Sequence, residues 1–185
     1  MFNIKDKNTR TVILIGLAGG AAYFISKSSF LFTPIILSSL MKGLNLSATK
    51  SGFLMSQEML TLSLSTLALA TIVGKVSKQK LFMGGFLLLF LGLILTAASD
   101  SLTVIMVARM MVGIGGGMVA TVANAAISSS VDPERGFAVA LTVSGILSAI
   151  VMPLLTKLSD HFEHVGVFLC LALFAVLLVP FCRIL

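Results

Sequence analysis

The chain has 185 residues, of which 57% are apolar and 11% are charged, and its mean hydropathy is +1.09. Since an ordinary soluble domain is about 25% charged, this composition excludes both a soluble enzyme and a disordered protein. A bilayer core of about 30 Å takes roughly 20 apolar residues per helix, so the length allows about six crossings. The sequence predicts an all-α, polytopic membrane protein.

The apolar segments are separated by short polar breaks, and none alternates with the period of a strand. The predicted spans are residues 12–40, 51–73, 81–99, 102–127, 137–156 and 165–182. Only Asp100 and Ser101 separate the third span from the fourth, which predicts a tight helical hairpin. The first span follows several basic residues and is interpreted as a membrane helix, not as a cleaved signal. We expect a single six-helix bundle over residues 1–185, in contact with the lipid bilayer.

Basic residues are distributed unevenly between the two ends of these spans. Eight lie on the side of the N-terminus and three on the opposite side: Lys5, Lys7, Arg10, Lys75, Lys78, Lys80, Arg135 and Arg183 against Lys42, Lys50 and Lys157. By the positive-inside rule both termini are cytoplasmic, and we expect a multi-pass protein of the plasma (inner) membrane. The net charge of +6 follows mostly from this bias and requires no nucleic-acid partner.

Three charged residues remain inside the spans: Lys27, Glu58 and Arg109. Charges at this depth cost a few kcal/mol and usually face a bundle interior or a water-filled cavity. At 1.5 Å per residue, Lys27 lies about 2 Å beyond the midplane, with Glu58 roughly 6 Å and Arg109 roughly 8 Å on the same side. We therefore expect an acid between two bases that neutralise one another. Both a substrate-binding or ion-coupling site and a purely structural ion triad fit this arrangement.

Small and polar residues share helix faces with the three charges. Steps of three and four residues connect Arg109, Gly113, Gly116, Gly117, Ala120 and Asn124 on the fourth span, Gly16, Gly20, Tyr23, Lys27 and Pro34 on the first, and Glu58, Thr61 and Ser65 on the second. Gly113 and Gly117 form a small-xxx-small pair, which lets a neighbouring helix approach closely. Pro34 and Pro153 are predicted to kink their helices, with gating as a secondary role. We expect Tyr23 and Asn124 to join the charges in one site.

Two histidines, His161 and His164, lie three residues apart after the fifth span. Their spacing does not match the His-Glu-x-x-His motif of zinc proteases, and residues 157–164 are predicted to form a solvated loop. We expect no metal and no cofactor. The spans also contain no serine–histidine or paired-aspartate arrangement that would favour an intramembrane protease, so we expect no enzyme.

Three local features resemble the major facilitator superfamily of transporters. Residues 51–74 are similar to the family's second helix, ending on Gly74, the glycine that opens its cytoplasmic loop motif. Arg109 and the glycines after it resemble the fourth-helix motif, and residues 132–138 are similar to the short acidic–arginine loop before the fifth helix. The likeness covers essentially the whole chain and is to the N-terminal six-helix half of a transporter.

The resemblance implies a secondary active transporter of a small solute that works by alternating access. A second copy, or a separate C-terminal half, would complete the cavity; a fragment of a longer transporter fits equally well. Lys27 and Arg109 would attract an organic anion, Tyr23 would supply a hydrogen bond, and Glu58 would carry a proton or pair with the bases. The chain departs from the family's loop motif at Lys78, where an aspartate is expected. The alternative is a non-transporting membrane scaffold or accessory subunit with a structural ion triad.

Overall fold

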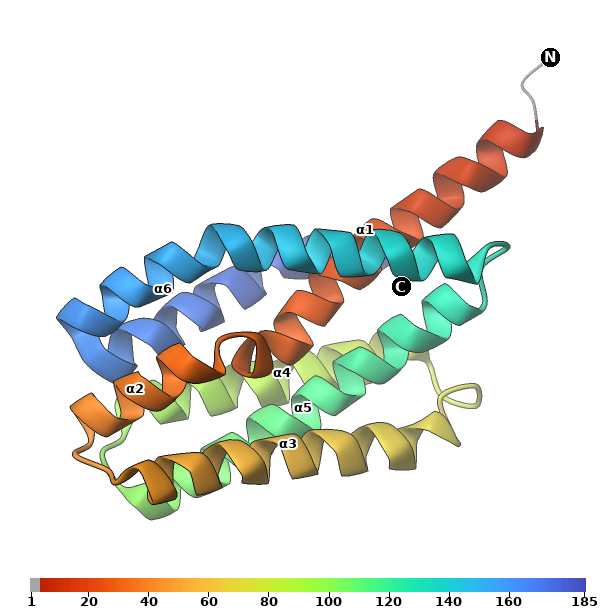
Figure 1. Ribbon diagram of the computed structural model, residues 1–185. Coiled ribbons are helices and arrows are strands. Elements are labelled where there is room, and N and C mark those ends of the chain that lie inside the picture. Colours follow the sequence, from red (N-terminus) through yellow and green to blue (C-terminus); the bar gives the residue numbers. More distant parts are fainter. Residues whose placement is uncertain (1–3) are drawn as a thin grey trace.

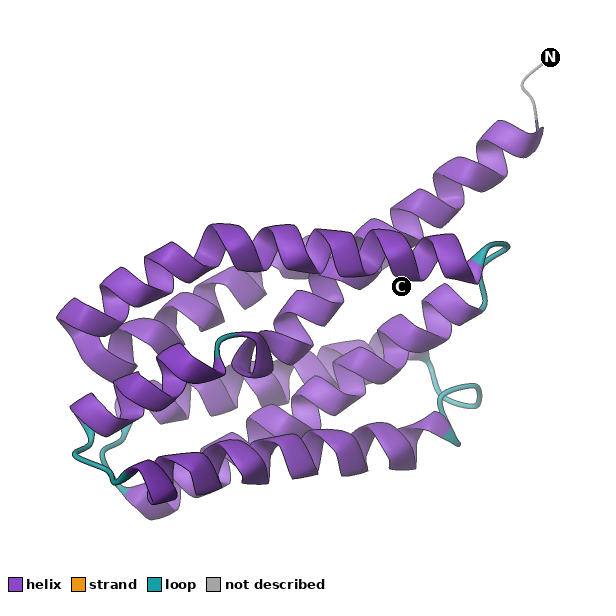
Figure 2. Cartoon of the chain, viewed as in Figure 1, coloured by secondary structure: helices purple, strands orange, loops and turns teal. Residues whose placement is uncertain are grey.

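The computed structural model describes residues 4–185, and of residues 4–7, 183 and 184 it describes the backbone without the side chains. Lys5, Lys7 and Arg183 of the basic count therefore lie outside the described side chains. The described residues form helices joined by short loops and include no strand (Figures 1 and 2), which confirms the all-α prediction. Five of its helical stretches are long and apolar enough to cross a membrane.

The first predicted span consists of two helices, α1 (Ile4–Leu31) and α2 (Thr33–Gly43), which meet at Phe32. Pro34 lies in the first turn of α2, where a residue without a backbone N–H removes no helical hydrogen bond. The helix break therefore lies beside the proline that the sequence singles out for a kink.

The next three helices follow the predicted spans closely. α3 (Ala48–Ala70) begins after Ser47, whose hydroxyl accepts a hydrogen bond from the backbone N–H of Lys50 at 3.3 Å, a normal N-terminal cap. α4 (Lys78–Ala98) and α5 (Leu102–Ser128) are connected by residues 99–101. The predicted tight hairpin between the third and fourth spans is thus present.

The helix α6 (Pro133–Leu178) covers most of the fifth and sixth predicted spans, and the 3-10 helix η1 (Val179–Ile184) follows it. As one straight helix its 46 residues would measure about 69 Å, more than twice the thickness of a bilayer core. The backbone leaves helical geometry at Glu163 (φ 50°, ψ −135°), and the chain folds back there, so that the two arms lie side by side (Figure 1). The helix continues through Pro153, where the kink stays a prediction.

The bend at Glu163 corrects the solvated loop predicted over residues 157–164. These residues are helical up to the bend, and His164 is only 3% exposed, whereas His161 is exposed. The charges in this segment mark the point where the apolar run ends. The helix continues past the first of them to Glu163, because the segment contains neither glycine nor proline, the residues that usually stop a helix.

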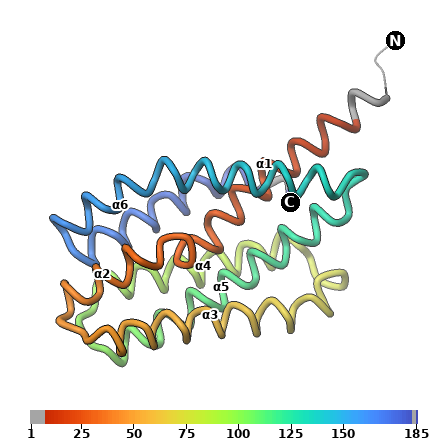
Figure 3. Tube along the Cα trace, viewed as in Figure 1, coloured from red at the N-terminus to blue at the C-terminus, as the bar shows by residue number. Residues whose placement is uncertain are grey.

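The helix α5 and the later turns of α1 connect the other helices, whereas the first turns of α1 extend beyond the bundle (Figure 3). α5 packs against α1, α3 and α4, while α1 also packs against α6. Gly16 and Gly20 make the contact between α1 and α6 close. A Cβ added at Gly16 would lie 2.8 Å from the Cβ of Val139, and one added at Gly20 would lie 2.6 Å from that of Val143. The small residues of α1 thus bring its backbone against the first arm of α6.

Candidate functional site

A buried ion pair joins α3 and α5. Nη2 of Arg109 lies 2.9 Å from Oε2 of Glu58, and the two side chains are 0% and 1% exposed. The helices approach closely here because Gly113, one turn after Arg109, has no side chain: a Cβ on it would lie 2.5 Å from the backbone carbonyl oxygen of Glu58. Each charge compensates the other where no water is available, as ionised groups in a membrane interior require.

Two further helices contact Arg109. Its Nη2 donates a hydrogen bond to Oγ of Ser29 on α1 at 3.2 Å, and its guanidinium carbon lies 4.8 Å from the centre of the Phe168 ring on the second arm of α6. The ring offers the cation a cation–π contact. Nε and Nη1 of Arg109 have no hydrogen-bond acceptor among the described residues. The pair therefore links α1, α3, α5 and α6 and leaves two buried donors unused.

Lys27 belongs to a second cluster, between α1 and α5. Its Nζ lies 4.6 Å from the centre of the Tyr23 ring, and the Tyr23 hydroxyl donates a hydrogen bond to Oδ1 of Asn124. Tyr23 is buried, while Lys27 and Asn124 are partly exposed. Within the described part of the chain, Lys27 has no carboxylate within 4 Å. The predicted cluster of a lysine, a tyrosine and an asparagine therefore holds a cation without a counter-ion.

The structure corrects the expected arrangement of one acid between two bases. Glu58 pairs with Arg109, and Lys27 does not join them. The depth of a residue in the membrane follows from its position in a span, but its direction around the helix axis decides its contacts. Ser29, which contacts Arg109, is two residues from Lys27, and this spacing turns the two side chains about 200° apart on a helix. Lys27 therefore points away from the ion pair.

Further along α5, two glycines bring this helix close to α1 and α3. A Cβ at Gly117 would lie 2.7 Å from the carbonyl oxygen of Leu62 on α3, and one at Gly116 would lie 2.9 Å from that of Ser26 on α1. These distances agree with the close approach expected from the small-xxx-small pair. Gly74 differs, because a Cβ on it would meet nothing within 4 Å; it makes no such packing contact.

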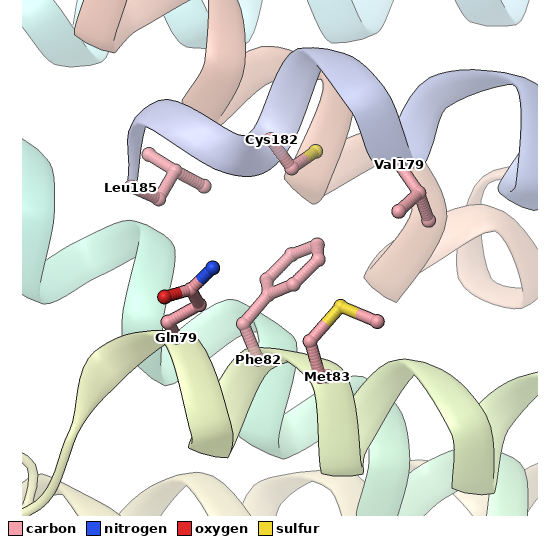
Figure 4. Close-up of a pocket in the computed structure, with 6 residues that line it drawn as sticks. All are labelled: Gln79, Phe82, Met83, Val179, Cys182 and Leu185. Atoms are coloured by element: carbon pink, nitrogen blue, oxygen red, sulfur yellow. The ribbon is translucent and has the colours of Figure 1, made fainter.

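A separate cavity of about 270 Å³ lies between the start of α4 and η1 (Figure 4). Its lining is Gln79, Phe82, Met83, Val179, Cys182 and Leu185. No residue of the predicted site belongs to this lining, and apart from the Gln79 amide and the Cys182 thiol its side chains are apolar. Among residues that the structure describes, no group of three or more His, Cys, Asp or Glu residues is placed to hold a metal ion.

Ser29 and Phe168 are the two residues beside Arg109 that the sequence-based prediction does not contain. Ser29 carries a usable signal, because it is a polar residue in an apolar span and lies on the opposite face from Lys27. Phe168 carries no signal in the sequence, because it is one of 13 phenylalanines. Its contact with Arg109 exists only because α6 folds back at Glu163.

A comparison with protein families agrees with this architecture. The model of the family described as Major Facilitator Superfamily matches residues 16–184, which is nearly the whole chain. A comparison with curated proteins gives no significant match. The matched region contains both the ion pair and the Lys27 cluster, and members of this family are in general secondary transporters. The chain belongs to the Major Facilitator Superfamily.

Proposed function

We propose that the chain crosses the plasma (inner) membrane six times, with both termini in the cytoplasm, and forms one half of a secondary transporter of a small organic anion. The first arm of α6 is long enough for one crossing, and the second arm is long enough for another together with η1. The reversal at Glu163 therefore brings the number of crossings to six. The excess of basic residues on the side of the termini supports the orientation.

The unpaired charge of Lys27 is the observation that supports an anionic substrate. Its ammonium group is partly exposed between α1 and α5 and has no carboxylate partner among the described side chains. A charge in a low-dielectric setting attracts an opposite charge far more strongly than it would in water. Asn124 is bound to the hydroxyl of the same Tyr23, and its amide nitrogen can donate to an anionic oxygen. This cluster therefore supplies the charge and the polar contacts that a small carboxylate needs.

Glu58 is the proposed coupling site for a proton. Protonation of its carboxylate removes the attraction to Arg109, whose Nε and Nη1 already lack acceptors in the described part of the chain. The freed guanidinium then adds an uncompensated positive charge to the bundle, which favours the entry of an anion. One proton and one monovalent anion enter together, so the net charge inside the membrane does not change. Binding of both shifts the protein between its two access states.

Transport tests this proposal directly. In proteoliposomes, a panel of radiolabelled small carboxylates should contain at least one that the wild-type protein takes up. For that anion, Lys27→Gln should lower the initial rate at least about tenfold, the effect of losing roughly 1.4 kcal/mol of attraction. Lys50→Gln, which removes an exposed lysine near the start of α3, is the matched control and should transport normally. Wild-type uptake by Lys27→Gln would contradict the anion site.

The same proteoliposomes test whether uptake is coupled to a proton. Uptake by the wild-type protein should increase when the outside is made acidic, and the double variant Glu58→Gln/Arg109→Met, which leaves no unpaired buried charge, should lose this response. If the double variant keeps the wild-type response, Glu58 does not carry the proton. If the wild-type protein moves no solute at all, the chain is better described as a non-transporting scaffold or accessory subunit.

A half-transporter needs a partner to enclose its substrate, and we propose a second copy or a separate C-terminal half. Because an even number of crossings returns the chain to its starting side, a second copy has the same orientation as the half that it replaces. In lipid nanodiscs the purified chain should show a protein mass of about 39 kDa, twice the 19.5 kDa of one copy. A mass of one copy would contradict the homodimer and leave the separate half as the partner.

A further inference from the structure

The bend of α6 contains a buried imidazole without hydrogen bonds. His164 is 3% exposed, and neither Nδ1 nor Nε2 has a hydrogen-bond partner among the described residues. Buried polar groups nearly always have a partner, so an unsatisfied one points to strain or to a function. The ion pair and the Lys27 cluster do not use this side chain.

The end of α2 packs directly against this imidazole. Gly43 is the last residue of α2, and a Cβ on it would collide with Nδ1 of His164 and lie 3.0 Å from Oε2 of Glu163. One turn before the bend, Asp160 forms a half-exposed salt bridge of 3.1 Å with Lys42 of α2. The end of α2 is therefore held on the bend by the imidazole and by one ion pair at the surface.

The bend itself is a strained conformation. Glu163 has φ 50°, a left-handed conformation that residues other than glycine, asparagine and aspartate rarely adopt. Such a conformation persists only while the surrounding contacts hold it. The contact between Gly43 and His164 is one of these, so loosening it also allows the bend to relax.

The burial of His164 makes this contact sensitive to protons. Burial lowers the pKa of His164 below its ordinary value, and the carboxylates of Asp100, from the connection between α4 and α5, and the adjacent Glu163 act in the opposite direction without outweighing it. Asp160 is occupied by Lys42, and His161 is exposed. A neutral imidazole tolerates this buried position. An imidazolium has two N–H donors and no acceptor bonded to either, and it is unstable there.

We propose that His164 is a proton-operated latch: the neutral imidazole keeps α2 docked on the bend of α6, and protonation releases α2. This part of the inference rests on the orientation of the proposed function, which places the latch at the outer end of the bundle. α2 continues the helix that carries Lys27, so its release opens the outer approach to that cluster when the outside becomes acidic.

Hydrogen exchange of the α2 amides tests the latch without any transport. In nanodiscs, exchange rates corrected for the intrinsic effect of pH report the opening of α2. If only the open state is protonated, with an ordinary histidine pKa of about 6.5, opening should increase by up to about 30-fold between pH 8 and pH 5. Equal protection of α2 at both pH values would overturn the proposal, whatever the protein transports.

The two histidines provide a matched pair of variants. His161→Gln removes the exposed imidazole and should keep the full pH response, while His164→Gln should lose it, because glutamine stays neutral at every pH. A response that survives in His164→Gln, or disappears in His161→Gln, would overturn the proposal.

A second measurement does not require His164→Gln to fold. The chain has only two histidines, so in His161→Gln the imidazole seen by NMR belongs to His164. Its protonation and the loss of α2 protection should occur over the same pH range. Protonation of His164 while α2 stays protected would show that the side chain titrates without acting as a latch.

Discussion

Glu58→Gln alone should destabilise the protein by about 3–5 kcal/mol, the range for removing one partner of a buried ion pair. Glutamine keeps the shape of the side chain but leaves Arg109, which is 0% exposed, as an uncompensated charge. Arginine cannot release its proton inside a protein. Ser29 and Phe168, its other contacts, are uncharged and do not replace the carboxylate. Unfolding by denaturant in bicelles measures this loss.

The reverse substitution distinguishes a buried charge pair from a lost contact. Arg109→Met leaves Glu58, which can take up a proton and become neutral. Its loss of stability should be smaller, and it should shrink as the pH falls, whereas that of Glu58→Gln should not. The double variant Glu58→Gln/Arg109→Met should recover most of the stability. Losses that simply add in the double variant would contradict the assigned pair.

The exposed salt bridge provides the control for these measurements. Lys42→Gln removes the partner of Asp160, and both side chains are more than half exposed. Such pairs contribute only about 0–1 kcal/mol, so the variant should unfold nearly like the wild-type protein. A loss as large as that of Glu58→Gln would indicate that the assay does not resolve buried from exposed charges.

Gly113→Ala should destabilise the protein by about 2–3 kcal/mol, although it adds a single methyl group. The added Cβ would lie 2.5 Å from the backbone carbonyl oxygen of Glu58 and collide with the hydroxyl of Thr61. A backbone atom cannot rotate away, so α3 has to move from α5, at the cost typical of overpacking. The displacement also lengthens the ion pair. Unfolding in bicelles, compared with the wild-type protein, measures the effect.

Gly145→Ala is the matched substitution, because Gly145 lies in α6 and a Cβ there would meet nothing within 4 Å. Alanine is a better helix former than glycine by about 0.5–1 kcal/mol. This variant should therefore be slightly more stable than the wild-type protein. The two alanine substitutions should have opposite signs; a stabilising effect of Gly113→Ala would show that α3 and α5 are not in close contact.

Much of the fold follows from hydropathy and from helix-breaking residues. The α4–α5 hairpin at Asp100 and Ser101 was predictable, because the bilayer fixes how many apolar residues one crossing takes and almost nothing remains between the two spans. The helix break beside Pro34 follows from the missing N–H of proline. The continuous helix before Glu163 was not predictable, since the end of an apolar run is not the end of a helix.

The candidate site was predictable in part. A search for charges in apolar spans finds Lys27, Glu58 and Arg109, because such charges are rare and costly in a membrane. It does not find which of them pair, since that depends on the rotation of each helix about its axis. Counting 100° per residue from Ser29 would have placed Lys27 away from Arg109. Phe168 depends on the fold-back of α6, which a local pattern does not encode.

The ion pair between α3 and α5 also constrains how the chain is synthesised. About 50 residues separate Glu58 from Arg109, and α4 lies between them. At about 5–20 residues per second, the ribosome makes Arg109 roughly 2.5–10 s after Glu58. During this interval α3 has no arginine to neutralise its carboxylate. The helix therefore either enters the bilayer with Glu58 protonated or waits beside the translocon until α5 arrives, so the order of translation and the final packing are coupled.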